Sequence, residues 1–347
     1  MFEMISNIID EFGINFSRFI NSGESIIGED IQYIKKKLKE YDTKNLFDKI
    51  LSSEPLKYDK ALNLAPFDII NSIESKRFFC KSAYEPFSPF KDKYKNYEEL
   101  HKITGEYITS TKRKNSKALI VLHGFFERSF EWTKLFVFPK LVNDYGYDIY
   151  AVELPHHMER QIQSSPFSGA FFFSGDPVIT IEAFRQSVSE LTQLSLLLDG
   201  VYDNINVVGV NLGGHIAMFS TIIDDSFDNY MLIQTGANFN EYIRNITDSS
   251  AYFEQNSHIN SIDNEFDFVN LYRALNFTKY KPIIDSRKIT IIAGKYDRII
   301  PFWSVKKLEQ IFYNAKTIYY DGGNFSINFI YNILLEQALS NNIKRRN

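Results

Sequence analysis

The sequence has few of the features that mark several common protein classes. Its single cysteine, Cys80, excludes an internal disulfide and a cysteine-rich zinc site. No apolar run approaches the roughly 18 residues that a membrane-spanning helix needs. Residues 1–10 lack a basic start and include acidic side chains, unlike a signal peptide. We therefore expect a cytoplasmic protein without a transmembrane segment.

Positive charge and metal-ligand patterns are scarce as well. The net charge is −4 and the basic residues are scattered, so nothing indicates a nucleic-acid partner. His156 and His157 are neighbours, but adjacent side chains usually diverge, and no second histidine or carboxylate cluster stands at ligand spacing. We predict no metal site and no cofactor.

The chain does have enough apolar content for a large core, with 44% hydrophobic residues among 347. Near the N-terminus, apolar residues step by three and four, which is typical of one face of a helix: Phe2, Ile5, Ile9, Phe12, Phe16 and Phe19. We predict a helical N-terminal extension over residues 1–100 that packs on the protein's own core. A membrane-surface or partner-binding helix is the other interpretation, and homo-oligomer formation through these helices stays open.

From about residue 101, short β-branched runs alternate with helical patterns. Strands are predicted over residues 118–124, 147–155, 204–210, 230–234, 288–293 and 317–320, and helices over 132–142 and 181–198. Residues 101–111, with polar neighbours, suit an edge strand. This alternation predicts an α/β protein with a mostly parallel central sheet flanked by helices.

One tight turn, between the strand predicted over residues 204–210 and the helical pattern that follows it, indicates the type of α/β fold. A buried strand runs into Gly209-Val-Asn211-Leu-Gly213, and a helical pattern follows at once. Glycines two positions before and after Asn211 let the chain fold sharply and lift one side chain above the sheet edge. The stretch resembles the nucleophile elbow of the α/β-hydrolase superfamily, in which the raised residue is a serine.

The resemblance implies roles for other positions. It implies a core over residues 101–347 and assigns the two backbone N–H groups of the oxyanion hole to Phe125 and Leu212. Asp297, in a Gly-x-x-Asp loop after a buried strand, matches the triad acid. Asn324 stands where the family's Gly-Gly-His-x-Ser loop presents the catalytic base. The triad would thus be incomplete, with only Asp297 kept.

An insertion over residues 237–286 is rich in aromatic side chains and lacks strand signals. In α/β-hydrolases this place often carries a helical cap, so we expect a lid there. Below it we expect a pocket that includes His123, His157 and Phe171.

The two asparagines decide the expected function. A carboxamide has no ionisation near pH 7, so Asn211 cannot act as an alkoxide and Asn324 cannot shuttle a proton. We expect Asn324 to donate to Asp297 and to face Asn211. The predicted function is binding of a small apolar or acyl-type ligand, or of a partner, without serine-hydrolase activity. The alternative is an esterase-like hydrolase or a lyase with unconventional residues, for which His123 or His157 would be the base.

Overall fold

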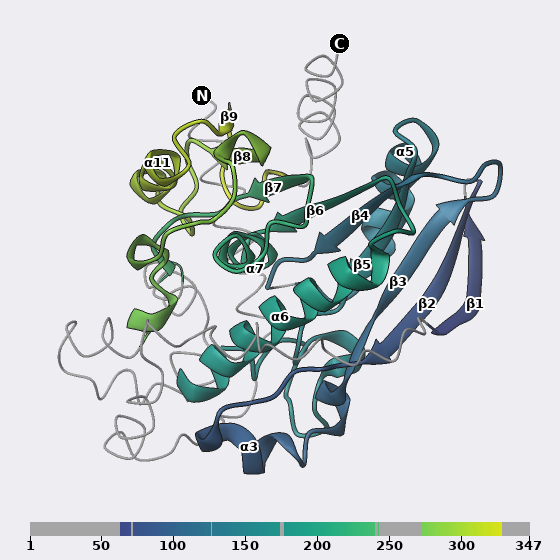
Figure 1. The fold of residues 1–347 in the computed structure, drawn as a ribbon, viewed down its shortest axis with the longest axis horizontal. Helices are drawn as coiled ribbons and strands as arrows, with labels where there is room; N and C mark the ends of the chain where they lie inside the picture. Colours follow the sequence, from purple (N-terminus) through teal and green to yellow (C-terminus); the bar gives the residue numbers. More distant parts are fainter. Residues whose placement is uncertain are drawn as a thin grey trace.

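The computed structural model describes residues 63–70, 72–125, 127–173, 177–239, 242 and 272–327. The predictions for residues 1–62 and for most of the cap therefore lie outside the described residues. The described part is built on one twisted sheet covered by helices (Figure 1).

The sheet has nine strands in the order β1-β2-β3-β5-β4-β6-β7-β8-β9. Their bounds are β1 Asn63–Ile70, β2 Ile73–Lys81, β3 Lys102–Ser110, β4 Lys117–Leu122, β5 Tyr147–Val152, β6 Asn204–Val210, β7 Asn229–Ile233, β8 Ile289–Gly294 and β9 Lys316–Tyr320. The strands from β5 to β9 in this order run parallel, whereas β1, β2 and β3 are joined by antiparallel pairing. The predicted α/β class with a mostly parallel sheet is confirmed.

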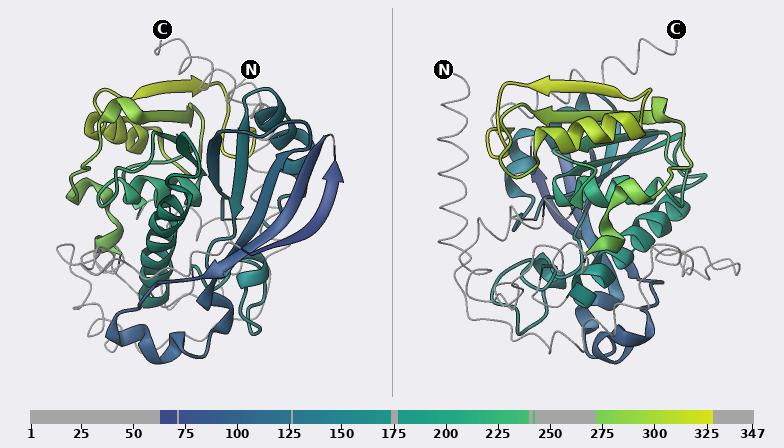
Figure 2. Two further views of the ribbon diagram at one scale, coloured as in Figure 1. Left: turned by 45° about the vertical axis from the view of Figure 1, so that its right-hand side comes forward. Right: turned by 90° about the vertical axis from the view of Figure 1, so that its left-hand side faces the viewer.

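Helices cover both faces of the sheet, which is why its central strands consist of nearly continuous buried apolar residues (Figure 2). The helices are α3 Ser88–Tyr94, α4 Glu131–Phe136, α5 Phe138–Asn143, α6 Pro177–Leu198, α7 Leu212–Ser220 and α11 Phe302–Ile311. Residues of α3, α6, α7 and α11 share one apolar core, and those of α5 belong to the core on the opposite face. Within the described ranges, no helix has the length and apolar character that crossing a bilayer requires.

Two expectations about the N-terminal side of the sheet are wrong. Residues 63–70 and 73–81 are not part of a helical extension, because they form the strands β1 and β2. The pairing of β2 with β3 runs from Ile73 opposite Ser110 to Lys81 opposite Lys102. The strand β3 is therefore interior and not at the edge. Its polar side chains find buried partners, as when Thr104 Oγ1 donates to Glu153 at 2.6 Å.

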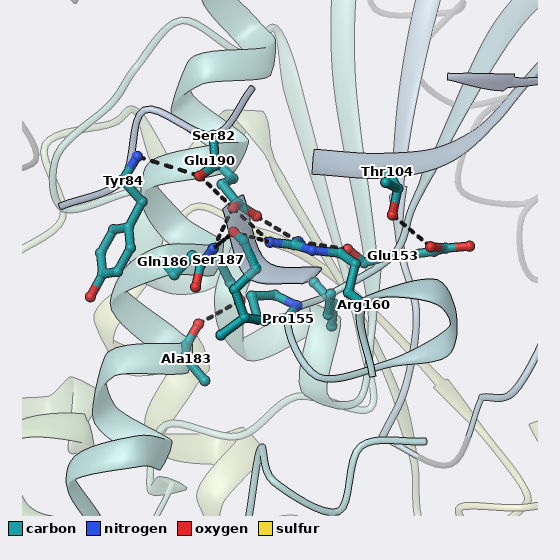
Figure 3. Close-up of polar contacts among 12 residues, drawn as sticks. Ser82, Tyr84, Thr104, Glu153, Pro155, Arg160, Ala183, Gln186, Ser187 and Glu190 are labelled. Atoms are coloured by element: carbon teal, nitrogen blue, oxygen red, sulfur yellow. Dashed lines mark hydrogen bonds and ion pairs between the residues drawn. The ribbon is translucent and has the colours of Figure 1, made fainter. Parts of the chain in front are cut away.

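The helix α6 is buried on all sides, with 20 of its 22 residues counted as buried. Its polar face lies against the loop after β2 and the loop after β5 (Figure 3). There Glu190 receives two hydrogen bonds of 2.7 Å from the guanidinium of Arg160 and one of 2.7 Å from Ser82. Because a buried charge needs a partner, this pair ties the loop after β5 to the helix.

Candidate functional site

The predicted tight turn joins β6 to α7. Asn211 has φ 55° and ψ −108°, and its backbone N–H donates to Ile233 O at 2.8 Å. A Cβ added to Gly209 would lie 2.2 Å from Gly213 O, and one added to Gly213 would lie 2.2 Å from Leu122 O. Both glycines are therefore required by close approach of the backbone. Asparagine is among the residues that tolerate a positive φ best.

The side chain of Asn211 folds back onto the start of α7. Its Oδ1 accepts a hydrogen bond of 2.9 Å from Leu212 N–H and a second one from the Tyr242 hydroxyl. A backbone N–H can only donate, so this contact fixes which end of the carboxamide is the oxygen. The Leu212 N–H is the group that the resemblance assigned to the oxyanion hole, and here Asn211 itself occupies it.

Asp297 and Asn324 lie together at the ends of β8 and β9. Asn324 Nδ2 donates to Asp297 Oδ2 at 3.2 Å and lies 3.4 Å from Oδ1, as expected from the sequence. Asp297 Oδ1 also accepts from the backbone N–H groups of Ile299 and Ile300, each at 2.8 Å. The expected amide-to-amide contact with Asn211 is not among the hydrogen bonds of the described residues, in which Oδ1 of Asn211 accepts from Leu212 and Tyr242 instead.

Tyr242 is a residue of this site that the sequence did not single out. Its side chain is fully buried, and its ring centroid lies 4.8 Å from that of His215, 5.4 Å from Phe239 and 5.9 Å from Phe173. Burial, and secondarily the charge of Asp297, raises the pKa of Tyr242 well above its usual value. The hydroxyl is therefore a neutral donor to Asn211.

Gln234 is a second such residue, and it anchors the loop that carries Asn324. It follows β7 with a φ of 51°, and its Nε2 donates to Asn324 O at 2.6 Å and to Gly323 O at 3.2 Å. The position of Asn324 beside Asp297 thus depends on a side chain from the neighbouring strand end.

His123 uses both of its ring nitrogens in backbone contacts. Nε2 accepts from Leu154 N–H at 3.1 Å, so Nδ1 carries the proton and donates to Gly124 O at 2.8 Å. The ring is 3% exposed, and burial lowers the pKa of His123 to about 4. It is a neutral side chain that fixes the end of β4 to the loop after β5.

His157 and Phe171 are also buried. His157 lies between Pro155 O, 2.9 Å from Nδ1, and Phe125 O, 3.2 Å from Nε2, and burial lowers the pKa of His157 well below its usual value. Phe171 stacks on His156 with ring centroids 6.0 Å apart. The predicted pocket of His123, His157 and Phe171 stays a prediction. In the described part of the chain, no three or more His, Cys, Asp or Glu side chains are grouped to hold a metal.

A groove of about 510 Å³ opens on another part of the same sheet edge, beside β2 and β3. Its charged residues include Arg77, Glu98, Lys102 and Glu159. The Arg77 guanidinium is paired with Glu159 at 2.6 Å, and Phe78 and Phe79 add apolar surface to the lining. The groove is not the pocket expected from the sequence, because His123, His157 and Phe171 are not among the residues that line it.

Comparison with known proteins identifies the architecture. No family model matches the sequence, and no curated protein matches it. In structure, the chain is similar to the acetyl xylan esterase from Paenibacillus sp. R4, with a TM-score of 0.54, 13% identity, and 92% of this chain and 98% of that chain covered. It is also similar to acetyl xylan esterase 1 from Thermoanaerobacterium sp. JW/SL YS485, with a TM-score of 0.52, 13% identity, and coverage of 86% and 94%. At such identity the likeness concerns the fold alone. With the strand order and the turn at Asn211, it shows that the chain has the α/β-hydrolase fold.

Proposed function

We propose that this chain is an α/β-hydrolase-fold protein that lacks serine-hydrolase activity and binds a small apolar or acyl-type ligand at Asn211. The observation that supports this most is the hydrogen bond from Leu212 N–H to Asn211 Oδ1. While this bond is present, the side chain in the nucleophile position occupies a donor that the reacting carbonyl of a substrate would need.

The chemistry of the two asparagines supports the same conclusion. Asn211 cannot form an alkoxide, and Asn324 cannot take up or release a proton near neutral pH. Hydrolases stripped of their triad still accelerate hydrolysis by about a thousand- to ten-thousand-fold over water through the oxyanion hole and substrate binding. With Leu212 N–H occupied, we expect even less from this site.

Buried aromatic side chains make the surroundings of Asn211 and Tyr242 apolar. Phe173 lies at the centre of the group, with ring centroids 4.5 Å from Phe125, 5.9 Å from Tyr242 and 6.1 Å from Phe239. Apolar surroundings of this kind suit an acyl chain or an aromatic ring better than a charged group. Asn211 supplies the polar contact beside it.

The second candidate is hydrolysis or elimination by unconventional residues, which we consider because the chain shares its fold with two acetyl xylan esterases. His123 is a poor base for this purpose because both of its nitrogens are hydrogen-bonded. Glu127 is the better candidate, because its backbone N–H donates to Gly124 O at 3.2 Å and Gly124 lies against Asn211. Burial raises the pKa of its carboxyl to about 7, which is suited to proton transfer near neutral pH.

The test is release of p-nitrophenol from p-nitrophenyl acetate and butyrate. We expect the unmodified protein to be no faster than Asp297→Ala. The double variant Asn211→Ser/Asn324→His frees Leu212 N–H and supplies the missing groups, so we expect it to be faster than both. Turnover by the unmodified protein that falls in Asp297→Ala or Glu127→Gln would contradict the proposal and favour the second candidate.

A further inference from the structure

The backbone of Asn211 brings its side chain and the next backbone nitrogen to the same side of the Cα–C bond. Substituents on a tetrahedral carbon are spaced by about 120°, so the ψ of −108° places Cβ within roughly 15° of eclipsing Leu212 N. The common strand and helix conformations hold these two atoms far from eclipsed. The turn thus keeps the carboxamide beside the nitrogen that follows it, and Leu212 N–H donates to Asn211 Oδ1 at 2.9 Å.

This is the geometry in which an asparagine can cyclise. A succinimide is a five-membered ring that closes between Cγ and the next backbone nitrogen, and closure requires Cβ and that nitrogen to be nearly eclipsed. The turn cannot relax easily, because the backbone packs closely against Gly209 and Gly213. Since α7 begins at Leu212, the N–H of Leu212 has no carbonyl acceptor within the helix. The nitrogen that would close the ring is therefore not held in the helical hydrogen bonds.

The other groups around the carboxamide suit the same reaction. The Tyr242 hydroxyl donates to Asn211 Oδ1, the oxygen on which negative charge develops when a nucleophile adds to Cγ. Nδ2 would be the leaving group, and no hydrogen bond among the described residues engages it. It is not one of the buried atoms without a partner, and Asn211 is 8% exposed. Solvent can therefore protonate Nδ2 and carry ammonia away.

We propose that Asn211 is a site of spontaneous covalent modification, in which Leu212 N attacks Asn211 Cγ and the turn becomes a succinimide. The bond between Leu212 N and Cγ forms, and the bond between Cγ and Nδ2 breaks. The proton of Leu212 N–H passes through solvent to Nδ2, which leaves as ammonia. Water then opens the ring at either imide C–N bond and leaves aspartate or isoaspartate at position 211. The reaction needs only water, so the inference does not depend on the proposed function.

Asn276 provides a matched comparison within the same chain. It too is followed by a large apolar residue, Phe277, but its ψ of 102° turns Cβ well away from the next nitrogen. Its Oδ1 accepts from the N–H of Thr278, two residues further on, at 3.1 Å. Asn276 is also more exposed than Asn211. Access to water alone would therefore favour modification of Asn276, whereas the backbone geometry favours Asn211.

The experiment follows both asparagines in the full-length protein by peptide mapping and mass spectrometry during incubation near neutral pH. The succinimide is recognised by the loss of one ammonia, and its product by the mass of aspartate. A second sample is kept unfolded in guanidinium chloride. We expect modification of Asn211 to be at least about tenfold faster in the folded protein, because folding supplies the orientation that ring closure needs. Modification of Asn276 should be slower in the folded protein.

Tyr242→Phe tests the part played by the hydroxyl. The variant loses the donor to Asn211 Oδ1, so we expect modification at Asn211 to slow by about tenfold or more. The control is Tyr230→Phe, because the Tyr230 hydroxyl donates to Asp224 O and not to Asn211. It should leave the rate at Asn211 unchanged. The inference is overturned if Asn211 is modified no faster in the folded than in the unfolded protein, or if Tyr242→Phe reacts as fast as Tyr230→Phe.

Discussion

Removal of the Arg160 guanidinium should destabilise the protein strongly. The side chain is fully buried, its partner Glu190 is 2% exposed, and two contacts of 2.7 Å join them. In Arg160→Met the carboxylate of Glu190 stays buried and keeps only the neutral donors Ser82 and Gln186. Breaking such a pair on one side costs about 3–5 kcal/mol, and we expect a loss in free energy of unfolding of that size.

Urea unfolding gives the measurement, with the midpoint and the slope fitted together. The control is Lys95→Met, because Lys95 and Asp92 form an ion pair 3.1 Å long whose side chains are 65% and 95% exposed. An exposed pair of this kind contributes at most about 1 kcal/mol. The double variant Arg160→Met/Glu190→Met should cost less than the sum of its two single changes, because no charge is left unpaired. A loss in Arg160→Met no larger than in Lys95→Met would refute the reasoning.

Three further predictions concern the turn at Asn211 and the dependence of stability on pH. Gly213→Ala places a methyl group 2.2 Å from Leu122 O, so we expect a loss of more than about 2 kcal/mol by urea unfolding, while Gly124→Ala, with its nearest atoms at 3.5 and 3.7 Å, should be tolerated. Burial lowers the folded-state pKa of His123 from 6.5 to about 4. The contribution of neutral His123 to the free energy of unfolding is therefore fully present above pH 6.5, and about 3 kcal/mol of it is lost as the pH falls to 4. This would be contradicted if the urea midpoint of His123→Gln fell with decreasing pH as strongly as the midpoint of the unmodified protein. Glu127 should have the opposite effect on the pH dependence of stability. Burial raises its folded-state pKa from 4.5 to about 7, so the free energy of unfolding falls as the pH rises through that interval. Glu127→Gln should remove this fall.

Features that depend on neighbouring residues could be predicted from the sequence. The turn at Asn211 is one, because Gly209 and Gly213 exclude side chains at positions where the backbone crosses itself. The parallel strands are another, because strands covered on both faces are apolar along most of their length. The hydrogen bond between Asn324 and Asp297 followed from the resemblance, which places both residues at the carboxyl edge of the sheet.

Features that depend on partners distant in the chain could not be predicted from the sequence. The strand β3 looked like an edge because it is polar, yet its Glu106 is buried against Lys134 at 3.0 Å and Ser75 at 2.9 Å. Tyr242 was one aromatic residue among many in the cap, and nothing local indicates that its hydroxyl reaches a residue 31 positions earlier. Gln234 contacts the Asn324 loop across 90 positions of the chain. The role of such a polar side chain is set by its hydrogen-bond partner, and that partner is known only from the folded structure.

The absence of a serine-type nucleophile at Asn211 is the central claim, and a fluorophosphonate tests it most directly. Such a reagent phosphonylates an activated serine of a hydrolase, and the adduct is detected by intact mass. We predict that the unmodified protein keeps its mass and that Asn211→Ser/Asn324→His gains one phosphonyl group at position 211. A stoichiometric adduct on the unmodified protein, removed by Asp297→Ala, would contradict the account.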